Sequence, residues 1–185
     1  MRVSLTPHPD MPSTAVGGIF VEVARDRRQR LQRGSRSMLI LRYMLELHRD
    51  GLRLPAPSSP ERSDALWEHT CFEAFVRLRG DAYCEFNFSP STQWAAYRFS
   101  SYRKGMTPLV IEAPVIAAIS GRPPHFEQRV SLDLESEDDL RDAPWRLALT
   151  AVIEEASGVK SYWALKHPPG KPDFHHADGF VLELP

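Results

Sequence analysis

Three features are missing from this sequence: long hydrophobic runs, a surplus of charge of either sign, and a set of cysteines large enough to cross-link it. Lys and Arg number 23 against 24 Asp and Glu, so the formal net charge is −1. Proteins that bind nucleic acids usually carry a basic surplus, so we expect no nucleic-acid partner. A membrane-spanning helix needs about 20 consecutive apolar residues, and no such run occurs. We therefore expect no membrane partner either.

Cysteine is almost absent, with Cys71 and Cys84 as the only two. The first 14 residues, MRVSLTPHPDMPST, are polar and broken by prolines, unlike the apolar centre of a signal peptide. A chain without such a signal is expected in the cytoplasm, where thiols stay reduced.

The strongly diagnostic chemical motifs are also missing. The chain contains no CxxC, HExxH, CxxCH or GxSxG motif and no glycine-rich phosphate loop. We therefore assign no catalytic residue, no resident metal and no cofactor. The sequence favours a non-catalytic role but does not decide against an enzyme.

Alternation of apolar and polar residues dominates what is present. It is clearest in SMLILRYMLELHR from Ser37 and HFEQRVSLDL from His125, and such alternation predicts strands with one buried face. Similar short segments begin at Gly17, Cys71, Tyr83, Gln93, Ala113, Trp145, Ser161 and Phe180. About ten short strands separated by turn residues indicate an all-β fold. We predict a two-sheet antiparallel β-sandwich that forms a single domain over residues 1–185.

Two segments depart from this pattern, and a third is rich in arginine. ESEDDLRDA from Glu135 is predicted as a helical turn, and the proline-rich stretch from Leu54 as a surface loop. Arginines gather around Gly34 between two predicted strands, and we interpret them as a solvated loop. They are Arg25, Arg27, Arg28, Arg30, Arg33 and Arg36.

The segments from Cys71 and Tyr83 predict a hairpin with a defined register. If Leu78 faces Ala82, the apolar side chains all fall on one face, whereas a slip of one residue mixes apolar and polar partners. That core face holds Phe72, Ala74, Val76, Cys84, Phe86 and Phe88. The opposite face then carries Trp67, His69, Cys71, Glu73, Phe75, Tyr83, Glu85 and Asn87. It is either a ligand-binding face or a solvated one, and the sequence leaves open whether other segments cover it. This register places the two cysteines on opposite faces, so they should remain free, with Cys71 the more accessible.

Several stretches together resemble a known family. They are WEHTCFEAF from Trp67, EFNFSP from Glu85, WAAY from Trp94, YRKGM from Tyr102, SYWALKHP from Ser161 and GKPDFH from Gly170. These resemble bacterial DOMON-like proteins related to type 9 carbohydrate-binding modules, in a branch labelled by its neighbourhood to a peptidoglycan-precursor reductase gene. The resemblance implies a β-sandwich that binds a sugar or haem, and a connection with cell-wall metabolism.

A saccharide site needs aromatic rings for stacking and polar groups for the hydroxyls. The hairpin supplies rings and acceptors, and the proline-rich loop from Lys166 supplies donors on a backbone that prolines hold in shape. We predict one pocket between them. Trp94 and Arg98 are expected to extend the hairpin face. The predicted ligand-binding residues are Trp67, His69, Glu73, Tyr83, Glu85, Asn87, Arg103, Trp163, Lys171 and His175.

Alternatives remain open for the same residues. His69, Cys71 and Glu73 with His175 or His176 resemble a zinc set, although the spacing is a weak signal. Met38, Met44 and Met106 with a histidine are candidates for non-covalent haem ligation. Glu73 and Glu85 resemble a glycosidase pair. The preferred interpretation is a domain that binds a saccharide or a similar small polar ligand. The next is a haem electron-transfer domain, and the third is a structural or partner-binding domain. Nothing in the sequence indicates an oligomeric state.

Overall fold

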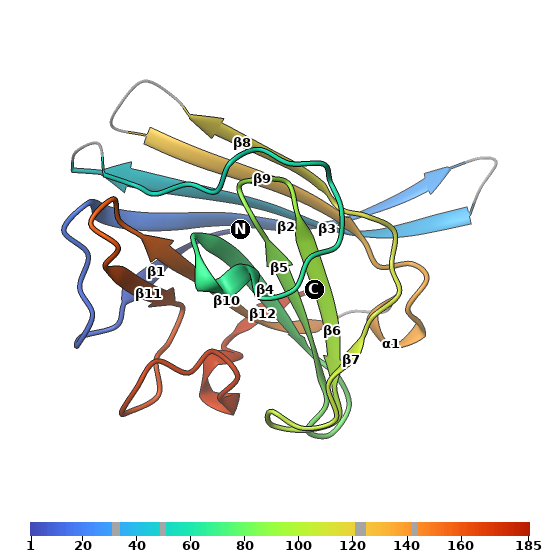
Figure 1. Cartoon of the computed structure of the whole chain (residues 1–185). Coiled ribbons are helices and arrows are strands. Elements are labelled where there is room, and N and C mark those ends of the chain that lie inside the picture. The colour runs from blue at the N-terminus through green and yellow to red at the C-terminus, as the bar shows by residue number, and fades with distance from the viewer. Residues whose placement is uncertain (31–33, 49–50, 121–124, 142–143) are drawn as a thin grey trace.

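Antiparallel strands make up nearly all of the regular structure. The computed structural model describes residues 1–30, 34–48, 51–120, 125–141 and 144–185 (Figure 1). Its strands are β1 (Arg2–Pro7), β2 (Val16–Arg30), β3 (Gly34–Leu47), β4 (Cys71–Arg77), β5 (Tyr83–Phe88), β6 (Trp94–Phe99), β7 (Thr107–Pro108), β8 (Val115–Ser120), β9 (His125–Asp133), β10 (Trp145–Glu154), β11 (Lys160–Ala164) and β12 (Leu182–Leu184). The helical segments are η1 (Leu66–Glu68), α1 (Asp138–Arg141) and η2 (Ala177–Gly179).

These strands form one hydrogen-bonded sheet that curls into a half-barrel. Its order is β7-β6-β5-β4-β10-β11-β1-β2-β3-β9-β8, and β12 pairs with β10. The predicted all-β antiparallel class is confirmed, but a sandwich of two separate sheets is not. Strand β1 makes the difference because it pairs with both β11 and β2. We did not predict β1, since its segment has only one buried residue, Leu5.

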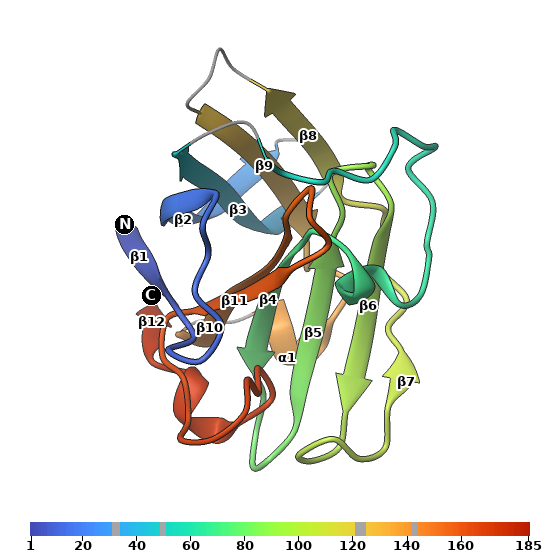
Figure 2. The ribbon, with the colours of Figure 1, turned by 60° about the vertical axis from the view of Figure 1, so that its left-hand side comes forward.

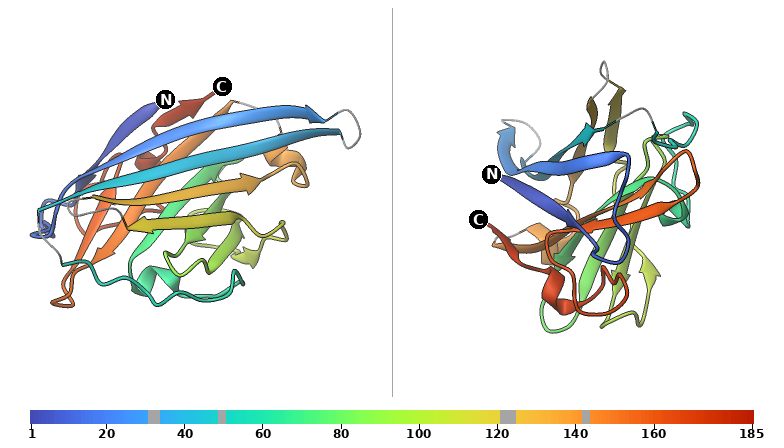
Figure 3. Two further views of the ribbon diagram at one scale, coloured as in Figure 1. Left: turned by 90° about the horizontal axis from the view of Figure 1, so that it is seen from above. Right: turned by 90° about the vertical axis from the view of Figure 1, so that its left-hand side faces the viewer.

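The curl brings two parts of the sheet face to face around the main core. Seen from above, β2, β3, β9 and β8 lie across β4, β5 and β6 (Figure 3). The rings of Phe72 on β4 and Phe126 on β9 stack with centroids 5.9 Å apart. Tyr43 on β3 donates a 2.7 Å hydrogen bond to the carbonyl oxygen of Glu73 on β4. Apolar burial between these layers is the main stabilising contribution to the fold.

The hairpin of β4 and β5 has the register predicted from its sequence. Phe72 pairs with Phe88 and Ala74 with Phe86, and the amide of Leu78 donates to the carbonyl oxygen of Ala82 at 2.9 Å. All six residues assigned to the core face lie in the main core. The apolar pattern alone was sufficient because only one register buries it.

The opposite face of this hairpin is covered, which settles a point that the sequence left open. Glu73, Glu85 and Asn87 are only 3%, 5% and 0% exposed. A second, smaller apolar cluster forms there from Leu66, Cys71, Phe75, Tyr83, Ala95, Tyr97, Phe99, Ala148 and Phe180. The cover comes from η1 and from the C-terminal segment, which lies beside β10, β4 and β5 (Figure 2). Apolar and polar alternation along a strand does not predict that segments distant in sequence will bury its polar face.

Of the three segments that depart from the strand pattern, two have the predicted structure and one does not. Helix α1 lies within the segment from Glu135, and residues 54–64 carry almost no regular structure, as predicted. The arginine-rich stretch is not a loop: β2 continues to Arg30 and β3 starts at Gly34. Arg33, Arg49 and residues 142–143 lie outside the described residues. No helix in the described part of the chain is long and apolar enough to cross a membrane.

Both cysteines are free, as predicted, and both are buried. The expectation that Cys71 is the more accessible is wrong, because the second cluster encloses it. Burial raises the pKa of the Cys71 thiol well above its ordinary value and that of Cys84 to about 12.

Since the thiolate is the reactive form, neither thiol should react with Ellman's reagent in the native protein. Both should react once the protein is unfolded in guanidinium chloride. Rapid labelling of one cysteine in native buffer, located by mass spectrometry, would contradict the burial of that residue.

Candidate functional site

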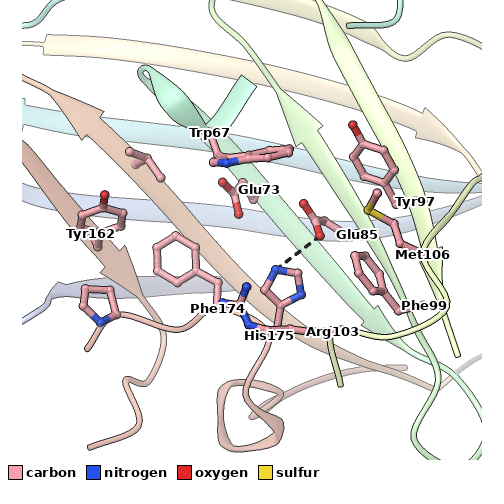
Figure 4. A pocket seen from close by; sticks show the side chains of 12 residues that line it. Trp67, Glu73, Glu85, Tyr97, Phe99, Arg103, Met106, Tyr162, Phe174 and His175 are labelled. Carbon is pink, nitrogen blue, oxygen red and sulfur yellow. Dashed lines mark ion pairs between the residues drawn. The ribbon is translucent and has the colours of Figure 1, made fainter. Parts of the chain in front are cut away.

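A pocket of about 440 Å³ lies between the outer face of the hairpin and the C-terminal segment (Figure 4). Its lining residues come from β4, β5, β6, β10, β11, η1, the turn before β7 and the loop after β11. They are Trp67, Glu73, Glu85, Tyr97, Phe99, Arg103, Met106, Val152, Tyr162, Pro172, Phe174 and His175. Hairpin and loop therefore contribute to one pocket, as we predicted.

Strand register explains why two carboxyl groups meet in this pocket. Glu73 pairs with Asn87, and Glu85 pairs with Phe75. Glu73 and Glu85 are therefore diagonal neighbours on one face, and their Cβ atoms should be about 7–8 Å apart. Both carboxyl groups point into the cavity in Figure 4. The pocket floor is thus acidic.

Register also places two rings that we did not predict. Tyr97 pairs with Glu85, and Phe99 pairs with Tyr83, so both share the face of the carboxyl groups. Trp94 and Arg98, which we expected there, lie at the other parity and on the other face. Trp94 belongs to the main core, and Arg98 pairs with Asp139.

Glu73 is the most enclosed group of the pocket. Its Oε2 accepts a 3.3 Å hydrogen bond from the hydroxyl of Thr150 on β10. Its Oε1 is buried without a hydrogen-bond partner. Burial and the nearby charge of Glu85 raise the pKa of Glu73 well above its ordinary value. The charged form of this carboxyl group is therefore disfavoured in the unliganded protein.

Glu85 is buried almost as deeply but has better partners. The side-chain amide of Asn87 donates to its Oε1 at 2.7 Å. Burial raises the pKa of Glu85 to about 6, although the bond from Asn87 and the charge of Arg103 lower it in part. Glu85 is therefore the carboxylate that is ionised first as the pH rises.

His175 closes the pocket opposite the carboxyl groups. Its Nδ1 lies 2.8 Å from the Tyr83 hydroxyl, and its Nε2 lies 3.8 Å from Oε2 of Glu85. Burial and the charge of Arg103 lower the pKa of His175 to about 4, so the ring is neutral. The Arg103 amide already donates to the Tyr83 oxygen. Tyr83 is then suited to donate its own proton to Nδ1, which favours the tautomer with Nε2–H facing Glu85.

An acidic clamp fixes the loop that carries His175. Asp173 accepts hydrogen bonds from the Tyr102 hydroxyl at 2.6 Å and from Arg103 at 2.8 Å. Burial raises the pKa of Asp173, but these two bonds outweigh it and lower the pKa overall. Arg103 has a positive φ of 52°, a conformation that turns the chain back here. Arg103 is thereby committed to Asp173.

The predicted site residues fall into three groups. Trp67, Glu73, Glu85, Arg103 and His175 line the pocket. Tyr83 and Asn87 lie directly behind it and hold His175 and Glu85. The other three, His69, Trp163 and Lys171, are not among its lining residues.

Each of these three has a structural reason to lie elsewhere. His69 contacts Glu154 at 2.7 Å, outside the pocket. Trp163 pairs with Ala151, so its side chain faces the main core and is 2% exposed. Its neighbour Tyr162 has the opposite parity and lines the pocket instead. Lys171 is exposed at the surface, and the nearby carboxylate of Asp173 pairs with Arg103 instead.

The zinc set considered from the sequence is not brought together. Cys71 is buried next to Asn87, and His69 is occupied by Glu154. No group of three or more His, Cys, Asp or Glu within the described ranges is arranged to hold a metal ion. Of the methionines considered for haem, only Met106 lines the pocket, together with His175.

Comparison with known proteins finds a similarity in structure but none in sequence. The sequence matches no protein-family model and no curated protein. The fold is similar to the 2.70 Å crystal structure of "a putative carbohydrate-binding protein" from Bacteroides uniformis, with a TM-score of 0.70. The match covers 100% of this chain and 86% of that chain at 14% sequence identity. At this identity the match establishes a shared fold.

Proposed function

We propose that this protein binds a saccharide or a similar small polar molecule in the pocket between the hairpin and the C-terminal segment. The observation that carries the proposal is Oε1 of Glu73, an acceptor that is buried, unpartnered and part of the pocket lining. Leaving such an atom without a partner costs about 1–3 kcal/mol, so a ligand donor at this position would recover free energy.

Aromatic side chains support a saccharide in particular. Trp67 is 43% exposed and lines the pocket, so part of its ring is available for stacking. Phe174 and Tyr162 add further rings with their centroids 6.0 Å apart. Sugar rings present C–H groups that pack on aromatic faces while their hydroxyls need hydrogen bonds. The carbohydrate-binding role named for the structural neighbour agrees with this proposal.

We further propose that the chain is a distant relative of the DOMON and type 9 carbohydrate-binding modules. The two facing parts of its curled sheet would then correspond to the two layers of their sandwich. We also propose a role in cell-wall metabolism, which the sequence resemblance supports, and a location in the cytoplasm, which the composition supports.

The proposal is tested by screening labelled protein on a glycan array and measuring hits by calorimetry. Trp67→Ala should weaken binding of a hit about tenfold, because stacking contributes roughly 1–1.5 kcal/mol. Glu68→Ala is the matched control, since Glu68 lies exposed on the same short helix and outside the lining. Equal affinities for the two variants would place the binding site elsewhere.

An absorption spectrum of the purified protein separates this proposal from haem binding. Met106 and His175 both line the pocket, so it is the place to examine for iron ligands. An intense Soret band that Met106→Ala removes would favour the haem alternative. A colourless protein that binds no glycan on the array would leave the structural or partner-binding alternative.

A further inference from the structure

We propose that the ligand of this pocket carries a positively charged amine, as an amino sugar does, and that Glu73 and Glu85 receive the ammonium group. This inference rests on the proposed function, because it names the chemical class of ligand for the same pocket. Three observations lead to it: the unpartnered carboxyl oxygen, the balance of charge around it, and the aromatic walls.

The unpartnered oxygen defines where a donor is missing. Glu73 is 3% exposed, and Thr150 contacts only its Oε2. Its Oε1 makes no hydrogen bond within the protein. The neighbouring Glu85 uses Oε1 for Asn87, while its Oε2 faces the cavity and His175 at 3.8 Å. Each glutamate therefore has one carboxyl oxygen left for a ligand, and Figure 4 shows both carboxyl groups pointing into the cavity.

The charge around these oxygens is negative. The titratable and charged groups facing them are Glu73 and Cys71 from β4, Tyr83 and Glu85 from β5, Tyr97 from β6, Arg103 from the following turn, Tyr162 from β11, and Asp173 and His175 from the C-terminal loop. Arg103 is the one cation among them, and Asp173 neutralises it at 2.8 Å. His175 is neutral, and burial favours the uncharged forms of Cys71, Tyr83 and Tyr97. The two glutamates are left without a counterion.

Aromatic rings flank the same carboxyl groups. In Figure 4, Trp67 lies on one side of the Glu73 carboxyl and Phe174 on the other. The electron-rich face of an aromatic ring attracts a cation, most strongly where water is excluded. A carboxylate floor with aromatic walls therefore fits an ammonium group better than it fits an anion.

An ammonium group also resolves the conflict between the two carboxyl groups. Neighbouring buried carboxyls cannot both ionise easily, because each negative charge opposes the other. A neutral sugar does not favour the charged form of Glu73, whereas a cation favours ionisation of both carboxyl groups and supplies donors to Oε1 of Glu73 and Oε2 of Glu85. Such charge-assisted hydrogen bonds are stronger than neutral ones. Binding of an amine should accordingly release a proton.

The test measures four probes by calorimetry at pH 7: glucosamine, N-acetylglucosamine, glucose and ethanolamine. Glucosamine should bind at least about tenfold more tightly than glucose and N-acetylglucosamine. Its binding enthalpy should differ between phosphate and Tris buffers because of the released proton. Its affinity should fall as the pH drops from 7 to 5, since Glu85 then becomes protonated and the ammonium group remains charged.

Paired variants connect the preference to the pocket. Glu73→Gln should remove both the preference for glucosamine and the proton release while keeping the melting temperature. Glu68→Gln, an exposed change next to Trp67, should keep both. Equal affinity for glucose and glucosamine, or a preference that survives Glu73→Gln, would overturn the inference.

The outcomes also separate this inference from the proposed function. Array hits confined to neutral glycans would overturn the amine and leave saccharide binding intact. Binding of ethanolamine with no sugar bound would support the amine and overturn the saccharide. No binding of any of the four probes at millimolar concentration would overturn the inference, whatever the array shows.

Discussion

Replacing Phe86 by Ala should lower the free energy of unfolding by about 3–5 kcal/mol. Phe86 is fully buried in the main core, in the middle of β5. Its neighbours across the strands are Ala74 and Ala96, whose small side chains leave room for the ring. Neither alanine is able to fill the space that the ring would leave, so the cavity should persist and add to the lost burial.

Urea denaturation followed by fluorescence measures this loss. Phe86→Leu should cost clearly less, because it keeps most of the apolar volume. Val110→Ala serves as the control for a change at the surface, since Val110 is 85% exposed and should alter stability by less than about 0.5 kcal/mol. A loss below about 1.5 kcal/mol for Phe86→Ala would mean that the core repacks around the missing ring.

Phe86 also illustrates which parts of the fold the sequence predicts. The hairpin register followed from apolar alternation because one face of β4 and β5 packs against the other part of the sheet. Strand β1 escaped prediction because its pairing partners, β2 and β11, bury only Leu5 of its six residues. A short strand that contributes backbone hydrogen bonds rather than apolar burial leaves little trace in hydrophobic periodicity.

The site was predictable only where it depends on strand parity. Glu73 and Glu85 were placed together because β4 and β5 are joined by a tight turn that fixes their register. Similar turns join β5 to β6 and β10 to β11, but our sequence analysis did not use them to set a register. We chose Trp94 and Trp163 where the neighbouring parity, Tyr97 and Tyr162, lines the pocket. The burial of the whole face depends on contacts of Phe174 and Phe180 from far along the chain, which no local pattern encodes.

That burial leads to a pH-dependent stability difference at Glu85. Its pKa rises from 4.5 to about 6 on folding, chiefly because burial disfavours the charged form. Between these two pH values the folded protein binds the proton more readily than the unfolded chain does. Stability from this group is therefore present below pH 4.5 and is lost as the pH rises through 6, by about 2 kcal/mol in all.

Glu85→Gln removes this titration, so the variant should gain about 2 kcal/mol relative to the wild type between pH 4 and pH 7. His175 acts in the opposite direction: its pKa is lowered to about 4, so its contribution is lost as the pH falls from 6.5 toward 4. Because both proteins carry His175, its effect cancels in the difference. Urea denaturation of both proteins at half-unit pH steps measures that difference. Glu183→Gln, an exposed change on β12, should show a constant offset. If the stability difference between Glu85→Gln and the wild type also stays constant with pH, water must reach this carboxylate freely. The pocket floor would then not exclude the solvent with which a ligand must compete.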